Sequence, residues 1–538
     1  MQKGNRRTVL AGAAAGMGGL AAGLSLSGIG SSAFAESATP DNSGKPAPPA
    51  KVDPEDSRYR HLVSRVDNTR FMPQPEYFHL VNSTEQVVEA VNQATAAGKR
   101  ITVRSGGHCF DNLVDNDDVI IDMSGMGRVY FDSTHRAFAI EPGQELGDVY
   151  RKLFLGWGVT IPAGGCPEVG VGGHILGGGY GPMSRQFGLT VDHLYGVEVV
   201  TVDAEGAARV TVATREDNDP HRDLWWAHTG CGGGNFGIVT RYLMRSPEAE
   251  SEDPAQLLPR PPSEVLTFGL VWDWEDLDEE SFHRLTNQYG RWYQDNSAPD
   301  SPGNSVYSVL MLNGRVAQSV MLAGEVAGDN PEEQFEEFLA AVTEGMSSPP
   351  LRVEEQVPWL TQRLAAWADE NQPPRRKFKN GYLKQGLSDH QIAVLWEYLS
   401  QNDTVQPIGG VWLVGYGGHA NSVDPTDTAV FQRSSVLKTI YIATWEESDA
   451  DEECLGWVRS LYSDVYSETN GVPEFDDRND GCFINYADVD LTDPELNLSD
   501  TPWHELYYGD NYPRLQEIKA TWDPTNVFHH DLSVRAAK

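Results

Sequence analysis

The first stretch with chemical potential in this 538-residue sequence is a glycine-dense segment, residues 162–188, which also holds Cys166 and His174. Glycine loses more backbone freedom on ordering than any other residue, so this density indicates a close backbone contact. Consecutive N–H groups without side chains can approach and stabilise an anion. The segment therefore indicates a bound dinucleotide.

A second glycine segment, Gly232–Gly237, formally matches the pattern Gly-x-Gly-x-x-Gly. The residues that follow it, 238–242, read Ile-Val-Thr-Arg-Tyr and have strand character. A Rossmann fingerprint requires a helix at that place. The sequence therefore argues against a Rossmann fold.

The cysteines are too few for a dense disulfide framework, and their odd number leaves at least one with another role. They are Cys109, Cys166, Cys231, Cys454 and Cys482. No Cys-x-x-Cys pair and no His-Glu-x-x-His helix is present in the sequence. We therefore expect no metal site.

An alternation of helices and strands positions the first glycine turn. Ser83-Thr84-Glu85 opens an amphipathic helix that ends at Gly98, and a strand over 100–104 leads into Ser105-Gly106-Gly107. The apolar patterns predict a helix over 146–155 and further strands over 119–123, 129–131, 137–140, 196–202, 208–212 and 238–242.

The composition changes at residues 247–262, which marks a domain boundary. We predict a first domain over 59–246, a substrate domain over 247–482 and a C-terminal segment over 483–538. Longer apolar strands at 265–272 and 306–312 characterise the second domain, and a helix over 512–522 characterises the tail. The tail is expected to pack back on the first domain.

Several motifs occur in a specific order over most of residues 70–535. They are Arg104-Ser105-Gly106-Gly107-His108, the Cys-Pro-x-Val-Gly-Val-Gly-Gly-His run from Cys166, Gly177–Gly181, Asp192, Gly230–Val239 and Asp523–Phe528. Together they resemble the berberine bridge enzyme-like flavoproteins of the vanillyl-alcohol oxidase and p-cresol methylhydroxylase superfamily. The resemblance implies an α+β fold: a two-part FAD-binding domain of the p-cresol methylhydroxylase type, with an antiparallel-sheet substrate domain inserted before the C-terminal segment.

The resemblance also implies that FAD is attached at two points, with a ring nitrogen of His108 on the flavin 8α-methyl and the Cys166 sulfur on C6. An imidazole and a thiolate are nucleophiles, and an oxidised flavin is electron-poor, so both bonds are chemically reasonable. The alternatives are a turn histidine and a buried apolar thiol.

Other residues are expected at the cofactor by the same resemblance. They are Arg104, Ser105, Gly106, Gly107, Val169, Gly170, Gly172, Gly173, His174, Gly178, Asn235, Gly237, Ile238, Val239 and Asn526. For His174 we prefer a role in packing or in hydrogen bonding to the backbone near the cofactor. Val169 corresponds to a gate through which O2 reaches the flavin, and valine there favours an oxidase; plain packing is the alternative.

Oxidation of an alcohol by hydride transfer needs a base for the hydroxyl proton. Two tyrosines stand at predicted strand ends, in 411–418 and 484–491, and resemble a tyrosine pair of bacterial family members. We assign Tyr486 as the base and Tyr416 as its helper. For both, a core tyrosine with a satisfied hydroxyl is the alternative.

The resulting prediction is an exported oxidase that transfers a hydride from an alcohol of a natural product or sugar to flavin N5 and reduces O2 to H2O2. One alternative is oxidative C–C or C–N ring closure, which would use a carboxylate base. Another is a flavin- or carbohydrate-binding protein without turnover. The sequence leaves open the substrate's identity and the oligomeric state.

The N-terminal residues resemble a cleavable export signal. Residues 1–35 combine Arg6-Arg7, an apolar run and Ala33-Phe34-Ala35, which indicates secretion by the twin-arginine route; a membrane anchor is the alternative. Residues 36–58 are expected to be a flexible lead-in. The formal charge of −37 makes nucleic acid and anionic membranes poor partners of the mature protein.

Overall fold

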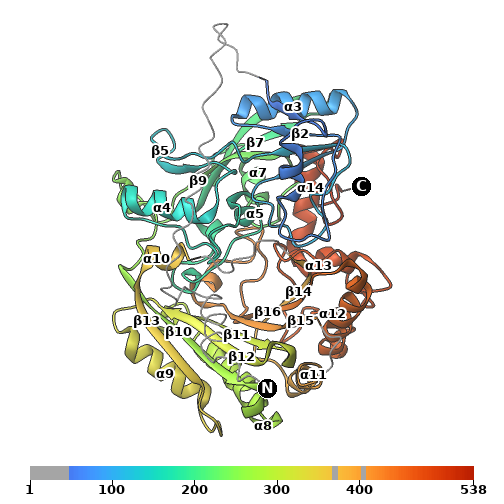
Figure 1. The fold of residues 1–538 in the computed structure, drawn as a ribbon. Coiled ribbons are helices and arrows are strands. Elements are labelled where there is room, and N and C mark those ends of the chain that lie inside the picture. The colour runs from blue at the N-terminus through green and yellow to red at the C-terminus, as the bar shows by residue number, and fades with distance from the viewer. Residues whose placement is uncertain (1–47, 366–373, 402–406, 538) are drawn as a thin grey trace.

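The computed structural model describes residues 48–365, 374–401 and 407–537 (Figure 1). The predicted export signal and the lead-in up to residue 47 lie outside the described residues. Among those that are described, no helix is long and apolar enough to cross a membrane. Three sheets organise the described residues: one of four strands, one of five and one of seven.

The N-terminal sheet has the strand order β1-β2-β4-β3. Its strands are β1 (Ala50–Val52), β2 (Tyr77–Leu80), β3 (Ile101–Arg104) and β4 (Val119–Asp122). Strands β2 and β3 each pair with β4 in parallel, and β1 pairs with β2 antiparallel. Helix α3 (Thr84–Ala96) begins as predicted, because the Ser83 side chain accepts a hydrogen bond from the Gln86 N–H.

The prediction of a flexible lead-in over 36–58 is wrong for its last residues. Strand β1 is part of the sheet, and the Val52 side chain is fully buried beside Phe78 and Ile120. Burial of this single apolar side chain and the backbone bonds to β2 order a stretch whose proline and charge content suggested a linker.

The second sheet is antiparallel with the order β5-β6-β9-β7-β8. Its strands are β5 (Val129–Asp132), β6 (Ala137–Ile140), β7 (Leu194–Val202), β8 (Ala208–Thr214) and β9 (Ile238–Met244). The helices of this part are α2 (Tyr59–Ser64), α4 (Leu146–Trp157), α5 (Val171–Leu176), α6 (Ser184–Phe187) and α7 (Arg222–Ala227). Strand β9 directly follows Gly237, as expected for a chain without a Rossmann fold.

The third sheet has seven antiparallel strands in the order β13-β10-β12-β11-β15-β16-β14. They are β10 (Glu264–Asp273), β11 (Val306–Asn313), β12 (Ser319–Val326), β13 (Leu351–Pro358), β14 (Arg375–Leu383), β15 (Ile408–Gly415) and β16 (Leu437–Trp445). Its helices are α8 (Glu279–Asp295), α9 (Pro331–Thr343), α10 (Trp359–Arg363), α11 (Asp389–Leu399) and α12 (Asp451–Val465). Helices α8, α9, α11 and α12 lie on the side away from the first domain (Figure 1).

The tail returns to the first domain. It contains α13 (Trp503–Tyr508) and α14 (Tyr512–Trp522), and α14 lies among the N-terminal elements (Figure 1). The buried Lys519 ammonium donates to the carbonyl of Asn235, and Phe528 forms a bridge with Ile101. The predicted α+β fold, with an antiparallel-sheet domain inserted before the C-terminal segment, is confirmed.

Candidate active site

A cavity of about 830 Å³ lies between the glycine-rich segments of the first domain and one face of the seven-stranded sheet. The first domain contributes the turn after β3, the segment around Cys166 and the segment before β9. The sheet contributes side chains of β11, β14, β15 and β16, and the tail contributes residues 483–487.

Two glycines bring the turn after β3 and the Cys166 segment together. A Cβ on Gly106 would lie 2.4 Å from the Gly170 nitrogen, and a Cβ on Gly170 would lie 2.2 Å from the Gly106 nitrogen. No side chain fits at either position, so the two backbones touch directly. As a result His108 and Cys166, far apart in sequence, both line the cavity.

The two predicted attachment residues have acidic neighbours. The Nδ1 atom of His108 lies 3.6 Å from the Asp67 carboxylate, which also contacts Arg376 at 3.3 Å. The Cys166 sulfur lies 3.4 Å from an oxygen of Glu168. Burial, with Glu168 adding to it, raises the pKa of the Cys166 thiol to about 12, so this thiol is protonated at neutral pH.

Arg104 and Ser105 stabilise the turn with their side chains. The buried Arg104 guanidinium donates to Asp122 at 2.7 Å. The Ser105 hydroxyl donates to the Pro142 carbonyl at 2.5 Å and accepts from the Gly172 N–H at 3.3 Å. Both residues also border the cavity, and Ser105 joins the turn to the glycine segment of Gly172.

Most residues predicted at the cofactor lie on the cavity wall. They are Arg104, Ser105, Gly106, Gly107, His108, Cys166, Val169, Gly170, Gly172, Gly173, His174, Gly237, Ile238 and Val239. The Nε2 atom of His174 accepts from the Gly164 N–H at 3.2 Å, which is the backbone contact expected for it. Burial lowers the pKa of His174 to about 4, so its ring is neutral.

Three predicted cofactor residues are not on the wall. Gly178 has φ +108°, and a Cβ there would point at Val430. The buried Asn235 amide donates to the Cys231 carbonyl at 3.1 Å and accepts from the Val534 N–H at 2.8 Å. Asn526 is exposed and occupies a left-handed turn with φ +54°. These three positions lie off the cavity wall, and their role at the cofactor stays a prediction.

The wall fits a dinucleotide such as FAD. Its first-domain side includes two stretches of glycine backbone, 170–173 and 232–234, and a Cβ on Gly173 would meet nothing within 4 Å, so this backbone faces open space. N–H groups of such segments can approach phosphates closely. The nucleophiles His108 and Cys166 border the same space, where they could hold the flavin.

Tyr486 lies on the cavity wall. The sequence predicted it at the end of a strand, and the structure differs on this point. Tyr486 stands in a turn of the irregular segment before η9 (Val489–Thr492). Its hydroxyl oxygen lies 2.5 Å from that of Tyr180. Burial raises the pKa of Tyr486 to about 12, and the bond to Tyr180 opposes part of that rise.

Tyr180 was missed by the sequence reasoning, which assigned the helper role to Tyr416. Tyr416 is buried outside the wall, with its hydroxyl 3.5 Å from the Gln432 carbonyl and its ring centroid 6.3 Å from that of Tyr180. Tyr416 follows β15, and its ring packs edge-on against Tyr180 with the Lys438 ammonium 4.9 Å from its centroid, so it lies behind Tyr180 and not beside Tyr486. The available signal for Tyr180 was its place in the Gly177–Gly181 motif.

A second residue missed from the sequence is Lys438 on β16. Its buried ammonium has no hydrogen-bond partner among the described residues. It lies 3.4 Å from the ring centroid of Tyr180 and 3.5 Å from that of Phe483. Burial lowers the pKa of Lys438 well below its ordinary value, whereas aromatic faces favour the charged form.

The sheet presents an apolar surface to the cavity. Alternate residues of three strands face inward because successive strand side chains point to opposite faces. They are Tyr307, Val309 and Met311 on β11, Trp412 and Val414 on β15, and Ile440 and Ile442 on β16. This surface suits a flat or hydrophobic part of a ligand.

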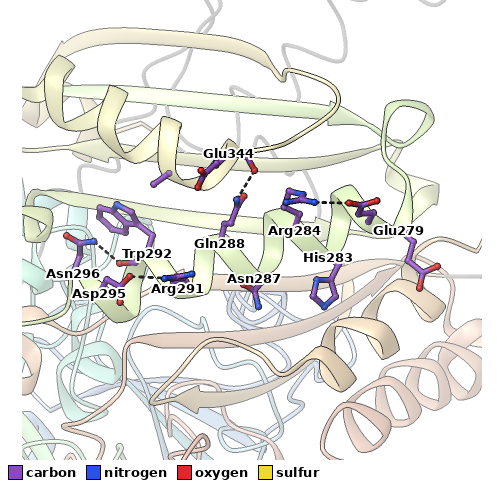
Figure 2. A pocket seen from close by; sticks show the side chains of 12 residues that line it. Glu279, His283, Arg284, Asn287, Gln288, Arg291, Trp292, Asp295, Asn296 and Glu344 are labelled. Carbon is purple, nitrogen blue, oxygen red and sulfur yellow. Dashed lines mark hydrogen bonds and ion pairs between the residues drawn. The ribbon is translucent and has the colours of Figure 1, made fainter.

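A polar groove along α8 is a second hollow, on the outer side of the sheet. Figure 2 shows that its side chains engage one another. Gln288 donates to the Glu344 carbonyl at 2.7 Å, and Arg284 pairs with Glu280 at 2.7 Å. Nothing in the groove converges on a shared point, so we assign it no site.

Known proteins resemble this chain over most of its length. Residues 75–209 match the FAD binding domain family, and residues 482–535 match the family described as berberine and berberine like. The aclacinomycin-N/aclacinomycin-A oxidase of Streptomyces galilaeus is 51% identical over 90% of this chain and 89% of that protein. The hexose oxidase of Chondrus crispus is 28% identical over 85% of this chain and 90% of that protein.

Solved structures of two oxidoreductases resemble this chain over most of its length. Aclacinomycin oxidoreductase superposes with a TM-score of 0.89 at 50% identity, covering 91% of this chain and 100% of that one. A glycopeptide hexose oxidase complexed with teicoplanin gives a TM-score of 0.87 at 48% identity over 91% of this chain and 99% of that one. The fold and the cavity define a FAD-dependent oxidoreductase of the vanillyl-alcohol oxidase type. Within that class, the chain belongs to the berberine bridge enzyme-like family of FAD-linked oxidases.

Proposed function

We propose that this protein is an exported oxidase which oxidises an alcohol on the sugar of a glycosylated natural product, or on a free sugar, and produces H2O2. The observation that carries the proposal is the Tyr180–Tyr486 hydroxyl pair, which lies beside the residues suited to holding FAD. Relatives named as oxidases of aclacinomycin and of hexoses support this substrate class.

The FAD is proposed to be bound covalently through both His108 and Cys166. Both side chains border one cavity, and each has a nearby carboxylate, Asp67 or Glu168, that could accept its N–H or S–H proton on attachment. Each attachment would also replace a C–H bond of the flavin, and the electron pair left on the ring would pass to O2 together with the protons, giving H2O2. Two attachment points would fix the edge of the flavin while its face stays open to substrate and O2. Bound FAD would supply the two-electron acceptor for the hydride of the alcohol carbon.

In this reaction Tyr486 is the base. A phenol with a pKa raised to about 12 is a weak acid, so the phenolate needs local stabilisation. The Tyr180 hydroxyl can donate to the Tyr486 oxygen. A negative charge on this pair would also favour the ammonium form of Lys438, which lies over the Tyr180 ring and would offset that charge.

The alternative of oxidative ring closure with a carboxylate base receives less support. Asp67 is the only carboxylate among the described residues that line the cavity. It is engaged with Arg376 and lies beside His108. The apolar sheet surface around Trp412 instead offers room for the aglycone of a glycoside, whose sugar would then point towards Tyr486.

Export by the twin-arginine route, with cleavage after residue 35, remains part of the proposal. It rests on the Arg6-Arg7 pair and the Ala33-Phe34-Ala35 motif. That route carries folded proteins, which suits a chain that takes up its cofactor before export. Comparing the N-terminal sequence of the protein from medium and from cells would test it.

The activity is tested by H2O2 release in air with aclacinomycin A, teicoplanin and glucose as separate probes. We expect release with at least one probe, and bleaching of the flavin by the same probe without O2. Tyr486→Phe is the matched control, since it removes one hydroxyl and keeps the ring. Flavin that is not bleached by any alcohol or sugar, in a protein that binds FAD, would contradict the proposal and favour a binding protein without turnover.

A further inference from the structure

The turn that carries Tyr486 has little regular structure of its own. The Tyr486 N–H donates to the Phe483 carbonyl at 3.0 Å, and no helix or strand includes residues 481–488. The Tyr486 ring is half-buried and stacks on Phe110 with centroids 5.6 Å apart. The position of its hydroxyl therefore depends on whatever fixes this turn.

One side chain from the neighbouring sheet closes the turn at both ends. The Oδ1 atom of Asn380 accepts from the Phe483 N–H at 2.6 Å, and its Nδ2 donates to the Tyr486 carbonyl at 2.8 Å. Asn380 is 2% exposed and does not belong to the cavity wall. It therefore holds the backbone of the base without touching the space for substrate.

The strand behind this amide is itself firmly held. Asn380 pairs with Ile440 in the β14–β16 ladder, and its carbonyl accepts from the Tyr462 hydroxyl at 2.9 Å. The preceding Lys379 reaches Asp488 at 2.6 Å, so the chain beyond the turn is fixed to the same strand. Asn380 is thus a rigid reference point for Tyr486.

The chemistry of a carboxamide explains why asparagine suits this position. It offers one acceptor and one donor on adjacent atoms, which match the N–H of Phe483 and the carbonyl of Tyr486. An alanine would leave both buried backbone groups without these partners. An aspartate could still accept from Phe483, but its ionised form could not donate to Tyr486.

We propose that Asn380 is a positioning residue for the reaction: it sets the turn 483–486 so that the Tyr486 hydroxyl meets that of Tyr180. This inference rests on the proposed role of Tyr486 as the base. A misplacement of about 1 Å from a site outside the chemistry can cost about a hundredfold in rate. We therefore expect Asn380→Ala to lower kcat by about 10- to 100-fold with little change in KM.

The experiment compares Asn380→Ala, Asn380→Asp, Tyr486→Phe and the double variant Asn380→Ala/Tyr486→Phe, with FAD bound and aclacinomycin A as the probe. Asn380→Asp should lose less kcat than Asn380→Ala, since it keeps the bond to Phe483. If Asn380 acts through Tyr486, Asn380→Ala should cost almost nothing more in the Tyr486→Phe background. Additive losses would overturn the proposal.

Asn479→Ala is the matched control. Asn479 is also a buried asparagine of this region, but its amide bonds to Asp476 and not to the turn of Tyr486. It should lower stability and leave kcat unchanged. If Tyr486→Phe keeps its full kcat, Tyr486 is not the base and the proposed function is contradicted. If Tyr486→Phe loses kcat while Asn380→Ala keeps it, only the positioning role of Asn380 is overturned.

A crystal structure gives a readout that does not depend on the probe. In flavin-loaded Asn380→Ala, the hydroxyl bond between Tyr180 and Tyr486 should be lost, and in Asn479→Ala it should be kept. If Asn380→Ala does not fold, the structure of Asn380→Asp takes its place. In that variant the Tyr486 carbonyl loses its hydrogen-bond donor, and we expect the carbonyl and the hydroxyl of Tyr486 to move. An unchanged hydroxyl pair in the folded Asn380 variant would overturn the proposal.

Discussion

The hydroxyl oxygens of Tyr180 and Tyr486 lie 2.5 Å apart, although 306 positions separate the two residues in the chain. Tyr180 lies within the glycine-dense segment of the first domain, and Tyr486 belongs to the tail that returns from the sheet domain. The two hydroxyl groups meet only when the first domain, the sheet domain and the tail have packed together. The proposed base is therefore a product of the complete fold.

Removing either hydroxyl of this pair should impair catalysis to different degrees. A general base contributes about 10²–10⁴-fold to a rate, so Tyr486→Phe should lower kcat by an amount in that range. Tyr180→Phe should cost less, since it removes only the donor to that base. Steady-state H2O2 release measures both, and equal kcat in Tyr486→Phe and the unmodified enzyme would contradict the assignment.

The rate should also depend on pH through Tyr486 and Lys438. Because burial raises the pKa of Tyr486 to about 12, its phenolate is scarce at neutral pH and kcat should rise as pH increases. Lys438→Met removes the amine that would take up a proton when the tyrosine pair becomes negative. An ammonium over an aromatic ring is worth about 2 kcal/mol when desolvated, so kcat should fall roughly 10- to 30-fold at neutral pH. A pH–rate profile of both proteins tests this, and identical profiles would exclude a role for Lys438.

Stability should respond to Lys438 with a defined sign. Burial lowers the pKa of this lysine in the folded state, while the unfolded chain keeps a value of about 10.4. Between the two values the unfolded state binds more protons, so the free energy of unfolding should rise with pH by at most about 1.4 kcal/mol per unit. Denaturant titrations of the unmodified protein and Lys438→Met should differ by this slope. Parallel curves would show that the ammonium is charged in the fold.

A buried ionic cluster should dominate the stability of the tail. Lys377 contacts Asp488 at 2.7 Å and Asp111 at 2.9 Å, and all three side chains are almost fully buried. Breaking such a cluster from one side costs about 3–5 kcal/mol, because it leaves uncompensated buried charge. Lys377→Met should lose this amount in urea unfolding. Arg284→Met, which breaks an exposed pair with Glu280, is the control and should lose less than about 1 kcal/mol.

Val169 provides a test of the proposed oxidase character. It lines the cavity next to the Cys166 segment, where we propose that it leaves a path for O2. Val169→Ile adds one methylene and should slow re-oxidation of the reduced flavin in stopped-flow mixing with O2. Reduction by the substrate should be nearly unchanged. If both half-reactions keep their rates, Val169 is only a packing residue.

Local features of the fold could be predicted because local physics determines them. The start of α3 depends on the Ser83 side chain and on the Gln86 N–H three residues later. The hairpin of β7 and β8 turns at Gly206, whose φ of +84° glycine adopts without strain. The motifs around His108 and Cys166 could also be predicted to lie at a close backbone contact, because they are rich in glycine. In the structure the backbones of Gly106 and Gly170 touch.

The partners of the proposed base could not be predicted in the same way. Lys438 stands in the apolar strand Leu437–Trp445, where the pattern shows a strand but not which rings enclose the ammonium. The strand pattern predicts Tyr416 near the base, and its ring does pack edge-on against Tyr180, but the hydroxyl that meets Tyr486 belongs to Tyr180. Such contacts depend on packing between segments that are far apart in sequence.

The most direct test of the account is the mass of the purified, denatured protein together with its visible spectrum, for the unmodified chain, His108→Ala, Cys166→Ala and the double variant. We predict that yellow colour and the mass of one FAD stay with the denatured unmodified protein and with each single variant, and that only the double variant releases its flavin. If the unmodified protein gives up its flavin on denaturation, covalent attachment through His108 and Cys166 is contradicted.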